Sequence, residues 1–358
     1  MPTTDRTVTD SMDLATAHGL PPLGGRVRVA PEDFVVEEQL GFEPDGAGGH
    51  VLLSVEKRGA NTGWVAAQLA RAAGVPARDV GYSGQKDRHA VTRQAYSLPW
   101  PVSAPLDACL GFAGEGYRVL SAGRHGRKLR PGSHRGNRFA IRIRDTDGDA
   151  GAIDARLRVI AEEGVPNYFG PQRFGRGQSN LLRARSWGQG GDAPTDRIQR
   201  GFALSAARSE IFNRMVEERV RRGDWNRLLP GEAVMLDGRR SFFAAPAIDA
   251  LLDDRCRRMD VHPSGPMWGR GESAATGAAR EVEDAVVGRE PGLARMLESA
   301  GLEQERRSLR LPVRSLRWTD EAGALLVEFE LPRGTFATAV LHELLRDAWT
   351  QDTGGEDS

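Results

Sequence analysis

Cysteine and lysine are scarce in this chain of 358 residues. Cys109 and Cys256 are the only cysteines, which is too few for a disulfide framework or a thiolate zinc cluster. This scarcity is typical of proteins from a reducing compartment, so we expect a cytoplasmic protein. Lysine occurs only at positions 57, 86 and 128, which we interpret as a compositional bias towards arginine.

Long apolar runs and cofactor motifs are also lacking. No apolar stretch is long enough to span a membrane, and the first residues carry aspartates where a secretory signal would be basic and then apolar. The chain has no GxxxxGK[ST], no strand-linked GxGxxG and no GxSxG, and none of its seven histidines pairs with another at metal-ligand spacing. These absences argue against phosphoryl transfer, hydride transfer and metallohydrolysis, so we expect a site with no metal and no cofactor.

Net charge is also absent, because 49 basic residues match 49 acidic ones. The distribution is uneven, however. Residues 118–144 include eight arginines and Lys128 with no acid, and residues 164–191 include four arginines with no acid. Such local basic stretches can neutralise phosphates even in a neutral chain, although each could also be ordinary solvated surface.

Strand patterns dominate residues 25–145. The clearest strand covers residues 137–144, where apolar residues alternate with arginines, so one face is expected to be buried and the other to present guanidiniums. Further apolar runs occur at Val27 and Val29, at 34–36, at 51–55 and at 94–98.

One helix is expected to interrupt these strands, with Thr62 as its cap, Val65, Leu69 and Ala72 as its apolar stripe, and Gly74 as its end. A second helix follows the strands, with a stripe of Ile153, Leu157 and Ile160 and an end at Gly164.

After Gly164 helical periods prevail, first over 205–222 and then over 281–300 with a break at Pro291. A strand at 325–331 and a helix at about 336–346 follow. An isolated C-terminal strand needs a sheet to join, and the N-terminal sheet is the obvious host. We therefore predict a discontinuous domain organisation: a flexible N-terminus at 1–20, a catalytic domain at 21–162 and 310–348, an inserted domain at 163–309, and a flexible tail at 349–358.

The segment Gly81–Gln94, GYSGQKDRHAVTRQ, is the strongest candidate for chemistry. Its glycines allow a tight turn, with Asp87 at the apex between Lys86 and Arg88. A turn of glycine and aspartate is common, so spacing alone leaves open that Asp87 only forms the turn.

This segment resembles the catalytic motif of the TruD family of tRNA pseudouridine synthases. Five other segments resemble motifs of that family in the same order: PEDFVVEE at 31–38, HRGNRF at 134–139, VPNYFGPQRFG at 165–175, LSAARS at 204–209 and LPRGTFAT at 331–338. The resemblance implies an α+β pseudouridine synthase fold, with a mixed, largely antiparallel sheet and an inserted, mainly helical domain specific to the family. It also implies conversion of uridine to pseudouridine in tRNA, at position 13.

The resemblance suggests roles for individual residues. Asp87 would be the catalytic carboxylate, Phe336 the ring on which a flipped uracil stacks, Phe34 a second wall of the pocket, and Asn137 a substrate contact. From the residues alone, both phenylalanines could be core residues and Asn137 could be a turn residue at the start of a strand.

Basic residues have two expected roles. Asp87 must be ionised, and Arg28, Lys86 and Arg88 are candidate cations beside it. Four further residues are expected to contact phosphates: Arg124, Arg127, Lys128 and Arg130. Asp87 could attack C1′ as a nucleophile or remove a proton from C2′ to give a glycal, and the sequence does not choose between these routes.

Two other functions compete with this hypothesis. The chain could be an RNA-binding protein or chaperone without catalysis, although its Asp87, Asn137 and Phe336 argue against that. It could also be an isomerase or lyase acting on a free nucleoside, although such a substrate needs no extended basic surface. We expect tRNA as the partner, no membrane association, and a monomer.

Overall fold

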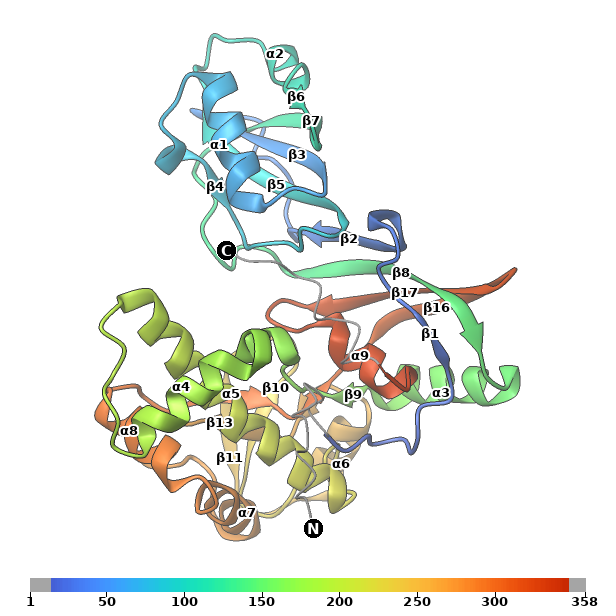
Figure 1. Ribbon diagram of the computed structural model, residues 1–358, viewed down its shortest axis with the longest axis vertical. Coiled ribbons are helices and arrows are strands. Elements are labelled where there is room, and N and C mark those ends of the chain that lie inside the picture. The colour runs from blue at the N-terminus through green and yellow to red at the C-terminus, as the bar shows by residue number, and fades with distance from the viewer. Residues whose placement is uncertain (1–13, 348–358) are drawn as a thin grey trace, which may run out of the picture. The chain divides into compact units, whose positions relative to one another are not determined.

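The computed structural model describes residues 14–347, which divide into two units (Figure 1). Unit 1 comprises the described residues up to Leu23, Gly148–Val313, and the described residues from Thr335 onward. Unit 2 comprises Gly24–Asp147 and Arg314–Gly334. The predicted tail at 349–358, and residues 1–13 of the predicted flexible N-terminus, lie outside the described residues.

Unit 2 is built on one ten-stranded sheet. Its strands are β1 (Gly24–Arg26), β2 (Phe34–Gln39), β3 (His50–Arg58), β4 (Gly81–Tyr82), β5 (Val91–Pro99), β6 (Ala113–Gly114), β7 (Tyr117–His125), β8 (Gly136–Asp147), β16 (Arg314–Glu321) and β17 (Ala324–Pro332). The hydrogen-bonded path runs β16-β17-β8-β2-β5-β3-β7-β6, with β1 paired to β8 and β4 paired to β5. Strands β2 and β5 are parallel, whereas the other neighbouring strands on this path are antiparallel, which confirms the predicted mixed, largely antiparallel sheet.

The C-terminal strand β17 joins the N-terminal sheet, as predicted. It pairs with β8 over nine positions, from Ala324 opposite Arg144 to Pro332 opposite Gly136. The prediction of a strand at Val27 and Val29 is wrong, because β1 ends at Arg26. At Arg28 the backbone turns into the left-handed region, with a φ of 58°, and leaves the extended path.

Helix α1 (Thr62–Ala73) packs on one face of this sheet, and the short α2 (Asp107–Leu110) follows β5. The predicted end of α1 is confirmed, because Gly74 adopts the left-handed C-cap conformation with a φ of 68°. The predicted cap is wrong, since Asn61 occupies the N-cap and Thr62 begins the helix. The stripe is also corrected: Val65 and Leu69 are buried, but Ala72 is exposed.

Unit 1 contains most of the helices. They are α3 (Ala150–Glu163), α4 (Ser179–Gly188), α5 (Arg197–Arg221), α6 (Ala250–Arg257), α7 (Gly277–Val287), α8 (Pro291–Ser299) and α9 (Ala337–Leu344). Helix α5 begins before the predicted position 205, because the Asp196 carboxylate accepts a hydrogen bond from the Gln199 amide and caps the helix there. The predicted break at Pro291 is confirmed, since α7 ends at Val287 and α8 starts at the proline.

Short strands accompany these helices, so unit 1 is less purely helical than its sequence pattern predicts. They are β9 (Val165–Pro166), β10 (Glu232–Leu236), β11 (Phe242–Ala245), β12 (Val261–His262), β13 (Ser264–Met267), β14 (Glu305–Ser308) and β15 (Arg310–Leu311). They form a three-stranded sheet and two strand pairs. Most of these strands have fewer than five residues, which leaves little periodicity for a sequence pattern to show.

Contacts group α3 and α9 with unit 1, although both lie in the segments that the sequence analysis assigns to the catalytic domain. Residues 14–20 also belong to this unit and are held in place, in contrast to the flexibility predicted for them. Leu14 is buried, and the Glu343 carboxylate accepts hydrogen bonds from the amides of Ala17 and His18 at 2.7 and 3.2 Å. The boundaries of the catalytic and inserted domains at residues 162 and 310 therefore remain predictions, and they differ from the two units that the contacts define.

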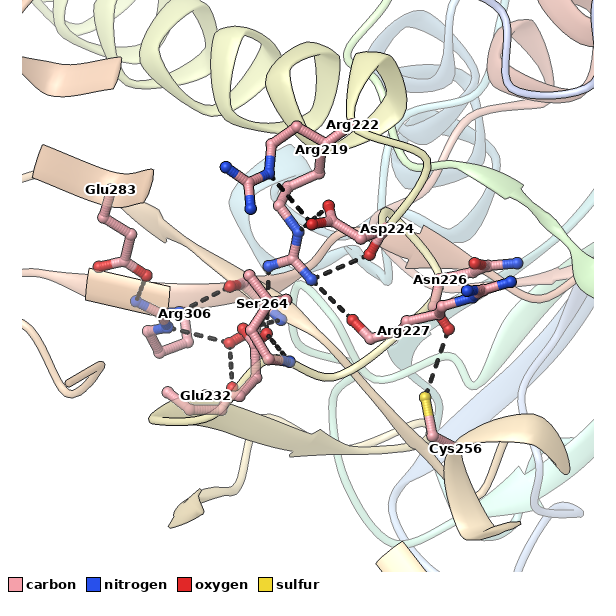
Figure 2. A network of polar contacts seen from close by, with 12 residues as sticks. Arg219, Arg222, Asp224, Asn226, Arg227, Glu232, Cys256, Ser264, Glu283 and Arg306 are labelled. Atoms are coloured by element: carbon pink, nitrogen blue, oxygen red, sulfur yellow. Dashed lines mark hydrogen bonds and ion pairs between the residues drawn. The ribbon is translucent and has the colours of Figure 1, made fainter. Parts of the chain in front are cut away.

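A buried network of charges fixes the interior of unit 1 (Figure 2). The Arg219 guanidinium lies 3.1 Å from the Glu232 carboxylate and 2.6 Å from that of Asp224, and both Arg219 and Glu232 are almost fully buried. Nearby, Arg306 pairs with the buried Glu283 at 2.7 Å. Burial raises the pKa of Glu232, and the charge of Arg219 opposes that effect. These groups need one another, because an unpaired buried charge is strongly destabilising.

Candidate active site

The loop that contains Asp87 runs from the end of β4 to the start of β5 in unit 2. Gly81 and Gly84 do not adopt left-handed conformations, so the expectation that these glycines serve a tight turn is corrected. Gly81 is needed for close packing instead. A Cβ atom there would lie 2.5 Å from the Leu129 carbonyl oxygen and 2.7 Å from the Ser97 hydroxyl.

Three buried side chains hold this loop by its backbone. The Thr62 hydroxyl accepts a hydrogen bond from the Lys86 amide at 3.0 Å, and the Gln94 amide donates to the Gly84 carbonyl at 2.5 Å. The Lys57 ammonium donates to the carbonyl of Asp87 at 2.7 Å. The Asp87 backbone is thereby positioned from helix α1 and from strands β3 and β5.

Of the three candidate cations, Arg28 contacts the Asp87 carboxylate. Its guanidinium lies 3.2 Å from Oδ2, and the Asp87 side chain stays 40% exposed, so the carboxylate is both paired and accessible. The two sequence neighbours point elsewhere: Lys86 forms a buried ion pair with Glu38 at 2.7 Å, and Arg88 donates to the Gly59 carbonyl at 3.4 Å. Arg28 is thus the direct partner that the sequence left undecided.

Arg28 also connects Asp87 to Phe34. The guanidinium carbon lies 4.2 Å from the centre of the Phe34 ring, a distance typical of a cation–π contact. The ring itself is 1% exposed and meets Phe139 edge to face at 6.2 Å. Phe34 is therefore a buried residue that supports Arg28, which is the core alternative considered for it, and its predicted contact with a base stays a prediction.

Asn137 lies on the same face of the sheet as these groups. It faces Glu38 in the β2–β8 ladder, and the Glu38 carboxylate holds Lys86, the neighbour of Asp87. Within residues 14–347 its buried amide oxygen has no hydrogen-bond partner. An unsatisfied buried acceptor is costly, so this oxygen is suited to receive a donor from a substrate.

Lys57 titrates unusually. It is 1% exposed, and burial lowers its pKa to about 8, while the charge of Asp87 acts in the opposite direction. The backbone of the Asp87 loop therefore rests on a cation that can lose its proton near neutral pH.

The predicted phosphate-binding residues differ in their surroundings. Arg124 donates to four carbonyls, those of Trp100, Pro101, Val102 and Ala104, and so fixes the loop after β5. The Lys128 ammonium contacts the Arg78 carbonyl. Arg127 and Arg130 are exposed. The latter two are the better placed to meet phosphates, whereas the guanidinium of Arg124 is occupied by the fold.

The row of arginines predicted on β8 is present but compensated. Arg138 pairs with Glu330 at 3.0 Å, Arg142 with Glu321 at 2.7 Å, and Arg144 with Asp33 at 2.7 Å; the residues concerned alternate with the apolar ones that face the core. Arg138 also lines an open cleft of about 680 Å³ together with Glu37 and Arg93. This face of the sheet is thus a salt-bridged surface with little excess of positive charge.

Phe336 belongs to unit 1, at the N-cap of α9. Its ring is half-buried, 6.1 Å from the Phe169 ring and 5.6 Å from the Arg173 guanidinium carbon. Its predicted role as the stacking ring stays a prediction.

Comparison with known proteins supplies the family. The profile of tRNA pseudouridine synthase D (TruD) matches residues 14–184 and 186–344. The chain belongs to the TruD family. Two similar relatives, both named tRNA pseudouridine synthase D, come from Nitrosococcus oceani, with 46% identity over 94% of each chain, and Pseudomonas aeruginosa, with 45% identity over 92% of each.

A crystal structure of a candidate TruD protein from Methanosarcina mazei has the same fold. It superimposes with a TM-score of 0.71 at 19% identity, covering 93% of this chain and 96% of the other. This agreement confirms the pseudouridine synthase fold expected from the sequence.

Sequence reasoning about the TruD motifs missed three residues of the loop support, namely Lys57, Glu38 and Thr62. A signal for Lys57 was present: it continues the alternation of Val51, Leu53 and Val55, so it had to face the buried side of its strand. Glu38 and Thr62 gave no comparable signal, because their partners are far away in the sequence.

Within residues 14–347, no group of three or more His, Cys, Asp or Glu side chains is arranged to hold a metal ion. No helix in that range is long and apolar enough to cross a membrane.

Proposed function

We propose that this chain isomerises uridine to pseudouridine in tRNA, at position 13, with Asp87 as the catalytic carboxylate. One observation carries the proposal: Asp87 is the accessible carboxylate of a loop held from α1, β3 and β5, and it is paired with Arg28 at 3.2 Å. Membership of the TruD family supports isomerisation of a tRNA uridine over RNA binding without catalysis.

The reaction needs a positioned carboxylate more than imported groups. The bond between C1′ and N1 of uracil breaks, the base turns, a bond forms between C1′ and C5, the proton on C5 is released, and N1 takes up a proton. The number of electrons does not change. A base within folded RNA must first be flipped out, and stacking on an aromatic ring such as Phe336 offsets about 1–3 kcal/mol of that cost.

Arg28 and Asn137 have distinct parts in this proposal. Arg28 keeps the carboxylate oriented, either for attack on C1′ or for removal of the C2′ proton. The free amide oxygen of Asn137 accepts a donor from the substrate, for which the N3–H of uracil is suitable.

Release of tritium from tRNA labelled at uracil C5 tests the proposal. We expect release with the wild type and at least about 10³-fold slower release with Asp87→Asn, because the variant lacks the charge that either route requires. Asp107→Asn, which changes an exposed aspartate of α2, is the matched control and should retain activity.

Three outcomes would contradict the proposal. Tight tRNA binding without release by the wild type would favour an RNA-binding protein, and turnover of free uridine would favour a nucleoside enzyme. Unchanged release from tRNA with cytidine at position 13 would refute that position. We further propose that the protein is cytoplasmic, which its two free, buried cysteines support, and that it is a monomer, which light scattering of the purified chain tests.

A further inference from the structure

Arg173, from the segment VPNYFGPQRFG, lies among the aromatic rings of unit 1. Its guanidinium carbon is 5.0 Å from the centre of the Phe169 ring and 5.6 Å from that of Phe336. A second guanidinium, that of Arg307, lies 4.2 Å from the centre of the same Phe169 ring. Two cations therefore share one aromatic ring beside the residue predicted to stack the substrate base.

The charge of Arg173 is poorly compensated within the protein. In the described range 14–347 no carboxylate oxygen lies within 4.0 Å of it, and it donates one side-chain hydrogen bond, to the Ser205 hydroxyl at 3.1 Å. Two arginines of the interior, by contrast, are paired with carboxylates: Arg219 with Glu232 and Arg306 with Glu283. A guanidinium has five N–H donors, so most of those on Arg173 remain available for a ligand.

Arg307 adds to the positive potential. It donates to the Asn167 side-chain oxygen at 2.7 Å, and burial lowers its pKa to about 9, an effect that the charge of Arg173 strengthens. Two guanidiniums that disfavour each other in a partly desolvated site would both be stabilised by an anion.

We propose that Arg173, with Arg307, binds a backbone phosphate of the tRNA next to the flipped uridine. This inference rests on the proposed function, because it takes tRNA as the substrate and Phe336 as the stacking ring. A guanidinium presents a planar fork that matches two phosphate oxygens, and a site with little water strengthens the contact. Binding of that phosphate would place the nucleotide over Phe336.

The salt dependence of tRNA binding tests this site. In the full chain carrying Asp87→Asn, which slows turnover so that binding can be measured, we expect Arg173→Gln to weaken tRNA binding at low salt by about tenfold or more. The slope of log Kd against log salt should become shallower by about 0.7–0.9, the value for one lost phosphate contact. Arg173→Lys keeps the charge and should keep the slope.

Arg240→Gln removes the same charge from an exposed position between β10 and β11 and is the matched control. Its slope should equal that of the parent. If Arg173→Gln also keeps the parent slope, the phosphate contact is refuted, and Arg173 only packs against the rings.

A second measurement uses the wild-type sequence at position 173 and so does not depend on the folding of a variant. Single phosphates of the tRNA are replaced by neutral methylphosphonates. We expect weaker binding when the phosphate on either side of the target uridine is neutralised, and no effect at any of those positions would overturn the inference. Release of tritium by the wild type, measured in parallel, shows separately whether the proposed function holds.

Discussion

The lysine beneath the Asp87 loop makes this region sensitive to pH. Lys57 has a pKa of about 8 in the folded chain and an ordinary value of 10.5. Between these values the unfolded chain binds more protons than the folded chain, so the contribution of Lys57 to the free energy of unfolding rises with pH from about 8 to 10.5. Below pH 8 that contribution is at its lowest, because a charged group must stay buried.

Replacement of Lys57 by methionine should remove this dependence. We expect the stability of the wild type relative to Lys57→Met to increase by up to about 3 kcal/mol between pH 8 and pH 10.5. Urea unfolding at several pH values measures the difference, and Lys128→Met, at an exposed lysine, serves as the control. A difference that does not vary with pH would show that Lys57 is not the titrating group.

At the scale of elements, the first turn of α1 supports the site. Thr62 was expected to cap this helix, but its hydroxyl instead accepts from the Lys86 amide at 3.0 Å and donates to Gln94 at 3.1 Å. Asn61 takes the N-cap position. The helix therefore fixes the backbone of the residue just before Asp87.

The variant Thr62→Val should separate positioning from binding. It keeps the shape of the side chain but leaves the Lys86 amide and the Gln94 side chain without this partner, which costs about 1–3 kcal/mol of stability. We expect kcat for tritium release to fall about tenfold with KM little changed, and Thr62→Ser to restore kcat. A normal kcat in Thr62→Val would mean that the loop is held well enough by Lys57 and Gln94.

Prediction from the sequence succeeded where a pattern is local or a motif is shared. Alternating side chains predicted β8, Gly74 marked the end of α1, and Pro291 marked the break between α7 and α8. It failed where partners are distant in the chain. The acids opposite the arginines of β8, and the choice of Arg28 over Lys86 as the partner of Asp87, depend on register and loop path, which one sequence does not encode locally.

At the scale of the whole molecule, the buried charge network and the proposed catalytic carboxylate lie in different units. The buried charge network of Figure 2 lies in unit 1, whereas Asp87 lies in unit 2. Arg219→Met would leave Glu232 and Asp224 without their main cation, and breaking a buried pair costs about 3–5 kcal/mol.

We therefore expect Arg219→Met to lower the midpoint of thermal unfolding while tritium release per folded molecule, measured well below that midpoint, stays unchanged. The double variant Arg219→Met with Glu232→Leu should recover part of the loss, since the buried Glu232 carboxylate is no longer left without its cation. A fall in activity without a fall in stability would show that Arg219 acts on the reaction instead.

The pairing of β17 with β8 also has a consequence for the order of synthesis. Ala324 is made 180 residues after Arg144, the residue it faces in the ladder. At about 5–20 residues per second, the ribosome needs roughly 10–35 s to cover that distance. During this interval the edge of β8 that β17 later occupies exposes unpaired backbone groups, which can recruit strands from other chains. Nascent chains that stall within unit 1 should therefore be the aggregation-prone form of this enzyme and the form that most needs a chaperone.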